Sequence, residues 1–198
     1  NKYKEAFLND HDHLFKNELV QLHDSWFAFD PVIGCNKDCS YCFLGTRGWR
    51  NTKPILRIDL NNNNNDISKA IQKEYESLIS NSLFRTSQNR RLDFLGIPPI
   101  SIGNKTDILQ SPNIEVLQSF LLSHNQSKNI STPIVVITKE LISLDFINSV
   151  KDLKFDVYLF ISLSYMSKNF EPGAQSHTKR IAKLKEIRNY IKQSNITN

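Results

Sequence analysis

The sequence lacks three features that would each assign it to a broad class of proteins. No apolar run approaches the ~20 residues that a membrane-spanning helix needs. No basic-then-apolar leader opens the chain, and its first residue is Asn1, which we interpret as a trimmed N-terminus. Cysteine is scarce, with 3 in 198 residues, and an odd, clustered set does not form a disulfide framework. These absences favour a cytoplasmic protein with reduced thiols and no membrane partner.

The composition is that of an ordinary soluble domain. Hydrophobic residues make up 39% of the chain and charged residues 23%, and 198 residues suffice for one domain with a hydrophobic core. The net charge of +5, from 25 basic and 20 acidic residues, is mild. Many cations fall between 179 and 192, where the solvated face of one helix explains them more simply than a binding surface does.

Strand-like and helix-like segments alternate along the chain. Residues 1–24 are polar, and Leu14, Phe15, Leu19 and Leu22 have the spacing of one amphipathic helix, so we expect an N-terminal helical extension there. Residues 25–198 form the expected core. Its apolar runs predict strands at 26–33, 92–102, 133–138 and 155–163, and its apolar stripes predict helices at 66–79, 114–122, 144–150 and 181–191.

This alternation defines a fold class. Strands that alternate with helices form parallel βα units rather than a sandwich. Units of this kind need eight repeats to close a barrel, and this chain has about half of them. We therefore expect an α/β fold, an open partial (β/α) barrel that stops after about four βα units and is incomplete at its C-terminal end.

The most specific feature is the loop GCNKDCSYCF at 34–43. It places thiols at Cys35, Cys39 and Cys42, and soft thiolates suit iron–sulfur clusters, zinc or copper(I). A short loop can wrap three corners of one cubane and leave the fourth iron open for a substrate or cofactor. The number and spacing of the thiols favour an iron–sulfur cluster.

Zinc is the main alternative at this loop. A structural zinc site takes four ligands, often from paired C-x2-C knuckles. The fourth ligand would have to be a distant histidine, namely His11, His13, His23 or His124. Buried cysteines without a metal are a third interpretation.

The spacing C-x3-C-x-aromatic-C, with Tyr41 as the aromatic residue directly after the first strand, resembles the signature of the radical S-adenosylmethionine (SAM) superfamily. The resemblance implies a [4Fe–4S] cluster on Cys35, Cys39 and Cys42, with SAM chelating the open iron. It implies that an electron from the cluster cleaves SAM to methionine and a 5′-deoxyadenosyl radical, which abstracts hydrogen from a substrate. It also implies an external electron donor of flavodoxin or ferredoxin type, and it places Tyr41 near the adenine.

Later stretches resemble the spore photoproduct lyase-like branch of that superfamily. SIGNKTD at 101–107, VVITK at 135–139, FISLS at 160–164 and NFEPGAQSHTKRI at 169–181 follow strands in the order of that branch. In parallel α/β sheets, ligands bind at these carboxyl ends of strands. The resemblance implies the following SAM-binding residues: Tyr41, Asn104, Thr106, Asp107, Lys139, Ser162, Ser164 as an alternative to Ser162, and Arg180.

Some of these positions have a simpler explanation. Capping or ion pairing explains Asp107, Glu171 and Arg180 as well as ligand binding does. For Lys139 and Ser162 the resemblance favours function, with Lys139 assigned to the SAM carboxylate.

The resemblance is incomplete at one point. Members of the branch carry a further cysteine that returns hydrogen to the product radical, and here all 3 cysteines lie in the loop motif. Repair of DNA lesions by that route is therefore not expected, unless Tyr158 or Tyr165 replaces the thiol. The substrate stays unidentified, with a nucleic-acid base favoured by the branch and the positive charge. The alternatives are a peptide- or tRNA-modifying radical SAM enzyme and a zinc-stabilised interaction module.

Overall fold

The computed structural model describes residues 8–9, 20–22, 27–47, 53–58, 66–80, 99–127, 132–163 and 169–194. Its strands are β1 (Leu8–Asn9), β2 (Val20–Leu22), β3 (Phe27–Phe29), β4 (Val32–Ile33), β5 (Ile55–Leu56), β6 (Ile100–Ile102), β7 (Ile134–Thr138) and β8 (Val157–Ile161). Its helices are α2 (Ile67–Ser80), α4 (Ile114–Gln126), α5 (Leu144–Val150) and α6 (His177–Gln193), with a 3-10 helix, η2 (Phe43–Arg47).

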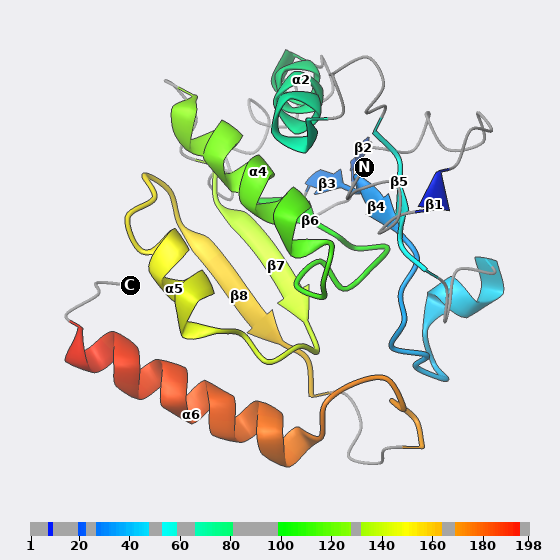
Figure 1. Ribbon diagram of the computed structural model, residues 1–198, viewed down its shortest axis with the longest axis vertical. Helices are drawn as coiled ribbons and strands as arrows, with labels where there is room; N and C mark the ends of the chain where they lie inside the picture. Colours follow the sequence, from blue (N-terminus) through cyan, green and yellow to red (C-terminus); the bar gives the residue numbers. More distant parts are fainter. Residues whose placement is uncertain are drawn as a thin grey trace.

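The strands form two sheets. The larger has the order β2-β3-β6-β7-β8, in which β3, β6, β7 and β8 are parallel and β2 joins β3 antiparallel. The smaller has the order β1-β5-β4. Helices α4 and α5 connect consecutive parallel strands, and α6 follows β8 (Figure 1). The expected α/β architecture of repeated βα units is therefore confirmed.

The hydrophobic core lies between the sheet and its helices. The Phe29 ring of β3 stacks on Phe120 of α4 with centroids 5.2 Å apart, and Tyr75 of α2 meets Phe120 edge-on at 5.6 Å. Asp66 caps α2, because its Oδ1 accepts from the N–H groups of Ser68 at 2.9 Å and Lys69 at 3.3 Å. Each large apolar side chain buried here stabilises the fold by roughly 1.5–3 kcal/mol. No helix in the described segments is long and apolar enough to cross a membrane.

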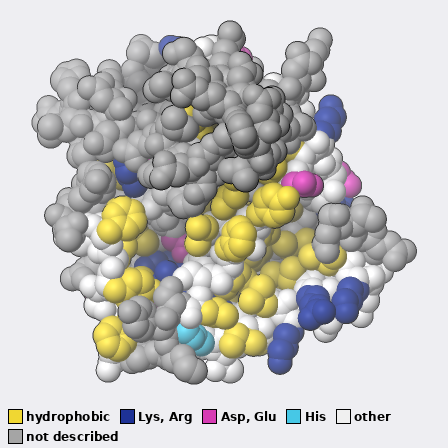
Figure 2. All heavy atoms as spheres, turned by 180° about the vertical axis from the view of Figure 1, so that it is seen from behind, with side chains coloured by type: hydrophobic (Ala, Val, Ile, Leu, Met, Phe, Trp, Pro, Cys, Tyr) yellow, Lys and Arg dark blue, Asp and Glu magenta, His cyan; other side chains and the backbone are white. Residues whose placement is uncertain are grey.

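The opposite face of the sheet is open. Alternate side chains of β7 and β8 point there, and Ile137, Tyr158 and Phe160 are 50%, 48% and 55% exposed. Figure 2 shows hydrophobic side chains gathered on this side of the molecule. A nearly continuous apolar run such as 133–138 predicts a strand that is covered on both faces, and the exposure of Ile137 shows that this prediction is wrong. The described helices cover one face of the strands only.

Two predicted elements need correction. Leu22 lies in β2, paired with Phe27 of β3, so the helix predicted for it is wrong. The other residues that marked this helix (Leu14, Phe15 and Leu19) lie outside the described residues. The strand predicted at 26–33 is two strands in different sheets, divided at Pro31. Proline has no N–H to donate, so a continuous ladder cannot pass through it.

Candidate cofactor site

The cysteine loop, residues 34–42, starts at the end of β4. Gly34 has a φ of 90°, in the left-handed region that glycine adopts without strain. Its N–H donates to the carbonyl oxygen of Lys105 at 3.1 Å, and its own carbonyl oxygen accepts from Thr106 Oγ1 at 2.6 Å. The loop is therefore fastened at its first residue to the turn that follows β6.

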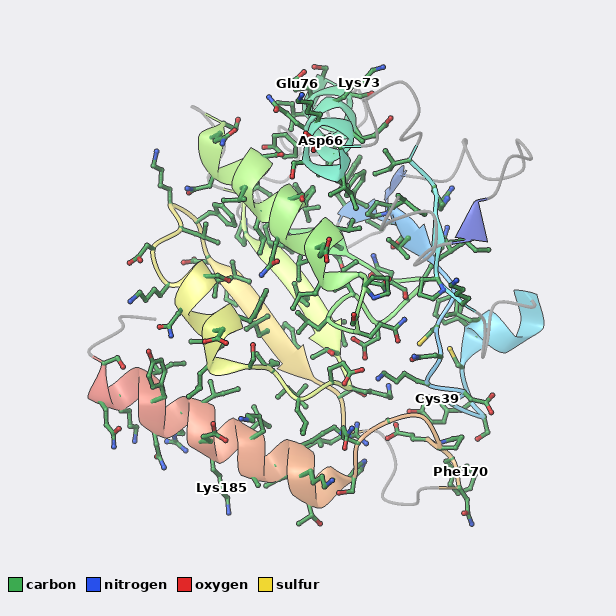
Figure 3. The ribbon with its side chains drawn as sticks, in the orientation of Figure 1. Cys39, Asp66, Lys73, Glu76, Phe170 and Lys185 are labelled. Carbon is green, nitrogen blue, oxygen red and sulfur yellow. The ribbon has the colours of Figure 1, made fainter. Side chains whose placement is uncertain are left out.

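A cavity of about 520 Å³ lies between this loop and the carboxyl ends of β6, β7 and β8. The volume is in the range of small-molecule sites. Figure 3 labels Cys39 on the side of the sheet toward which β7 and β8 run. Nine of the predicted site residues line the cavity: Cys35, Cys39, Tyr41, Cys42, Asn104, Thr106, Asp107, Lys139 and Ser162.

The thiols fit a soft metal group. Burial raises the pKa of Cys35 to about 11, although backbone N–H groups of Lys37 and Asp107 donate to it and act in the other direction. Burial also raises the pKa of Cys39, against the favourable charge of Lys139. Coordination to a metal deprotonates a thiol outright, and backbone N–H donors to sulfur are the bonds that ligating thiolates accept.

Among the described residues, no three His, Cys, Asp or Glu side chains converge as the ligands of one metal ion do. A cubane cluster requires a different arrangement of the three thiols from that of a single metal ion. Each thiolate binds its own iron corner, so the three sulfur atoms need not meet at one point.

His124 is not available as a fourth zinc ligand. Its Nδ1 lies 2.8 Å from the Tyr75 hydroxyl and its Nε2 lies 2.9 Å from the carbonyl oxygen of Thr132, so both ring nitrogens are engaged. The side chain, on the last turn of α4, is fully buried, and burial lowers its pKa. His11, His13 and His23 lie outside the described residues.

Asp107 organises the end of β7. Its Oδ1 accepts from Thr138 Oγ1 at 2.6 Å, and its Oδ2 accepts from the Lys139 N–H at 2.8 Å. The side chain is 5% exposed, and burial raises its pKa against these hydrogen bonds. Asp107 therefore fixes the backbone that carries Lys139, in addition to lining the cavity.

Asn104 and Thr106 also bond to the protein around the cavity. The Asn104 N–H and Nδ2 both donate to Asp30 Oδ1, at 2.7 and 3.3 Å, and its Oδ1 accepts from Ser101 Oγ at 2.7 Å. Thr106 Oγ1 donates to Gly34 and accepts from Asn113 Nδ2 at 2.9 Å. Their contacts show how the turn after β6 is held, and their predicted contact with SAM stays a prediction.

Lys139 and Ser162 lie together at the ends of β7 and β8. Lys139 Nζ donates to Ser162 Oγ at 3.0 Å and lies 5.6 Å from the centroid of the Tyr41 ring. Arg180 is buried behind them and does not line the cavity; its Nη1 donates to the Ser162 carbonyl oxygen and its Nη2 to Glu171. Ser164 lies outside the described residues.

Lys37 lines the cavity from inside the cysteine motif and was not among the predicted site residues. Lys37 is 4% exposed, and its ammonium group pairs with the carboxylate of Glu140. A lysine between the first two cysteines was the available signal. Nothing in the sequence indicates Glu140 as its partner, because 103 positions separate them.

These features define an α/β protein whose cysteine-bearing cavity opens at the carboxyl ends of parallel strands. Neither a protein-family model nor a curated protein matches the sequence. A solved structure of a spore photoproduct lyase double mutant with bound AdoMet and dinucleoside spore photoproduct is similar, with a TM-score of 0.52 and 17% identity. The match covers 81% of this chain and 42% of that one. The fold is thus a partial β/α barrel of the radical SAM type, as expected.

Proposed function

We propose that this chain is the cluster- and SAM-binding part of a radical SAM enzyme. One observation carries the proposal. Cys35, Cys39 and Cys42 line the same cavity as Lys139 and Ser162, from strand ends more than 90 positions away along the chain. Polar and charged groups from several strand ends around one cavity are typical of ligand sites in parallel α/β folds.

The chemistry would come from a [4Fe–4S] cluster, which supplies the electron that cleaves SAM to a 5′-deoxyadenosyl radical. The chain's own residues bind and orient. Three thiolates hold the cluster and leave one iron for SAM. The Lys139 ammonium group supplies a cation for the SAM carboxylate, and the Tyr41 ring an aromatic surface for the adenine.

We propose a nucleic-acid base as the substrate class and a flavodoxin- or ferredoxin-like protein as the electron donor. The net charge of +5 and the likeness to a protein with a bound dinucleoside photoproduct support the first part. The open face of the sheet, with Tyr158 and Phe160 exposed, supplies aromatic surface on which bases can stack.

The test is anaerobic reconstitution with iron and sulfide, followed by incubation with SAM and dithionite. We expect a brown protein that forms 5′-deoxyadenosine, and we expect Cys39→Ala to abolish the product. Colourless protein that carries stoichiometric zinc would establish the interaction module instead. Product formation by Cys39→Ala at the wild-type rate would refute the assigned ligands.

A further inference from the structure

The turn at 169–174, which follows β8, lies directly on the cysteine loop. The Ser40 N–H donates to the carbonyl oxygen of Phe170 at 2.9 Å, and the Gly173 N–H donates to that of Lys37 at 2.9 Å. A Cβ on Gly173 would lie 2.4 Å from the carbonyl oxygen of Asn36, so no side chain fits between the two backbones. Because of this contact, the turn has a fixed position relative to the cysteines.

The turn carries a buried carboxylate, Glu171, which is 2% exposed. One of its oxygens, Oε1, accepts from the Tyr41 hydroxyl and lies 3.9 Å from Lys139 Nζ. The other, Oε2, accepts from Arg180 Nη2 and lies 3.7 Å from His177 Nε2. Burial opposes its ionisation, but the hydrogen bonds from Tyr41 and Arg180 outweigh burial and lower the pKa of Glu171.

Two of these partners, Tyr41 and Lys139, face the proposed SAM site. Tyr41 and Lys139 line the cavity, whereas Glu171 does not. Lys139 and Arg180 both bond to Ser162, one to its hydroxyl and one to its carbonyl oxygen. One carboxylate behind the cavity wall therefore contacts an aromatic residue of the cysteine loop, the cation after β7 and the arginine that holds the end of β8.

We propose that Glu171 is a positioning residue for the SAM site, and this inference rests on the proposed function. Its carboxylate sets the orientation of the Tyr41 ring and of the Lys139 ammonium group toward the cavity, and its charge compensates one of the two positive charges of Lys139 and Arg180. Glu171 acts through these neighbours and does not itself touch SAM.

The charges indicate what its removal does. Lys139 and Arg180 carry two positive charges and Glu171 one negative charge, so one positive charge remains for the carboxylate of SAM. Without Glu171 the two cations repel each other, and Lys139 loses an anchor. The local potential also becomes more positive, which disfavours SAM because its sulfonium gives it a net positive charge.

The experiment measures SAM affinity by equilibrium binding to the anaerobically reconstituted full chain, together with the EPR spectrum of the reduced protein with and without SAM. For Glu171→Gln we expect unchanged iron and sulfide content, about tenfold weaker SAM binding, and a smaller change of the EPR spectrum on addition of SAM. Glu171→Asp keeps the charge and is expected to recover part of the affinity. The matched control is Glu186→Gln, which removes an exposed ion pair with Lys183 on α6 and is expected to bind SAM as wild type does.

Wild-type SAM affinity and EPR response in folded Glu171→Gln would overturn the inference, even if its melting temperature fell. If Glu171→Gln does not fold, the variants Tyr41→Phe and Glu171→Asp and their combination replace it. Because the proposal couples these two side chains, their effects on SAM affinity are expected to be non-additive, and additive losses would overturn it. Failure of the proposed function would look different, since wild-type protein would then bind no cluster or no SAM.

Discussion

Two buried carboxylates, Asp30 and Glu171, flank the cysteine loop, and their pKa values are shifted in opposite directions. Asp30, between β3 and β4, is 1% exposed; its Oδ1 accepts from Asn104, and its Oδ2 has no hydrogen-bond partner. Burial raises the pKa of Asp30, although Lys105 Nζ lies 3.9 Å from Oδ2. Glu171, after β8, is equally buried, but the pKa of Glu171 is lowered because Tyr41 and Arg180 donate to it.

The hydrogen-bond donors of the two carboxylates indicate that Asp30 and Glu171 have different roles. Hydrogen bonds to Asp30 come from the backbone and amide of Asn104, so this carboxylate fixes the turn after β6. Hydrogen bonds to Glu171 come from the side chains of Tyr41 and Arg180, so this carboxylate fixes groups around the cavity. We therefore expect loss of Asp30 to affect folding alone, and loss of Glu171 to affect ligand binding as well.

The largest effect is expected for Arg180→Leu, which leaves the Glu171 carboxylate buried without its closest cation. Breaking one side of a buried ion pair costs about 3–5 kcal/mol in the free energy of unfolding. Urea unfolding measures this loss. Lys183→Leu is the control on the same helix, since the Lys183–Glu186 pair is exposed and is expected to contribute about 0–1 kcal/mol. Equal losses for the two variants would show that the buried Arg180–Glu171 pair contributes no more to stability than an exposed pair does.

Gly173→Ala is expected to have the next largest effect, because its Cβ would meet three backbone atoms of Asn36 and Lys37 within 2.8 Å. Overpacking of this kind typically costs 1–3 kcal/mol, and here it also moves the cysteine loop. We expect lower thermal stability and faster loss of iron to a chelator. A variant that loses stability and keeps the wild-type rate of iron loss would show that the turn does not position the loop.

Asp30→Asn is expected to cost less, about 1–2 kcal/mol, because asparagine keeps an oxygen for the Asn104 N–H and the replaced charge was unfavourably buried. SAM affinity is expected to stay at the wild-type value. A loss of SAM affinity as large as that of Glu171→Gln would remove the distinction between the two carboxylates.

The smallest expected effect is that the contributions of Glu171 and Asp30 to the free energy of unfolding depend on pH in opposite ways. Because the pKa of Glu171 is lowered from 4.5, its charge adds stability above that pH, which is lost as the pH falls through its folded-state pKa. Because the pKa of Asp30 is raised from 3.8, its charge costs stability above its folded-state pKa, and acidification toward 3.8 relieves that cost.

To test both pH dependences, we would measure the free energy of unfolding of wild type, Glu171→Gln and Asp30→Asn across this acidic range. The advantage of wild type over Glu171→Gln should shrink on acidification, and its advantage over Asp30→Asn should grow. Differences of the same sign would contradict the assigned pKa directions.

Much of the fold was predictable, because the hydrophobic periodicity and the residues that cap or end each element indicate the same strands and helices. The apolar run 133–138 predicted β7 and the apolar stripe at 114–122 predicted α4, and the helix predicted from Asp66 onward is α2. The apolar stripe predicted for the final helix (Ile181, Leu184, Ile187 and Ile191) is buried only in part, since Ile187 is 7% exposed and Ile191 packs against the core. Ile181 and Leu184 are 42% and 37% exposed, whereas Arg180 is 1% exposed. Hydrophobic patterning cannot find a buried arginine whose burial depends on a carboxylate from another segment.

The candidate site was also predicted only in part, because some of its contacts join residues that are distant in the sequence. Cys35 was indicated by the spacing of the thiols, whereas Lys139 and Ser162 were indicated by the family resemblance and by their position after strands; all three line one cavity. The side-chain contacts of Asn104 with Asp30 join residues that 74 positions separate. Such contacts have no local signal, so the division of these residues between support and ligand binding follows from the tertiary structure alone.

The proposed function depends on three thiols that hold a cluster with an iron open to SAM. The most direct measurement is the EPR spectrum of the anaerobically reconstituted, dithionite-reduced chain before and after addition of SAM. We expect a [4Fe–4S] signal that changes on addition of SAM and is lost in Cys39→Ala. A signal that SAM leaves unchanged, or a colourless protein with bound zinc, would contradict the proposed function.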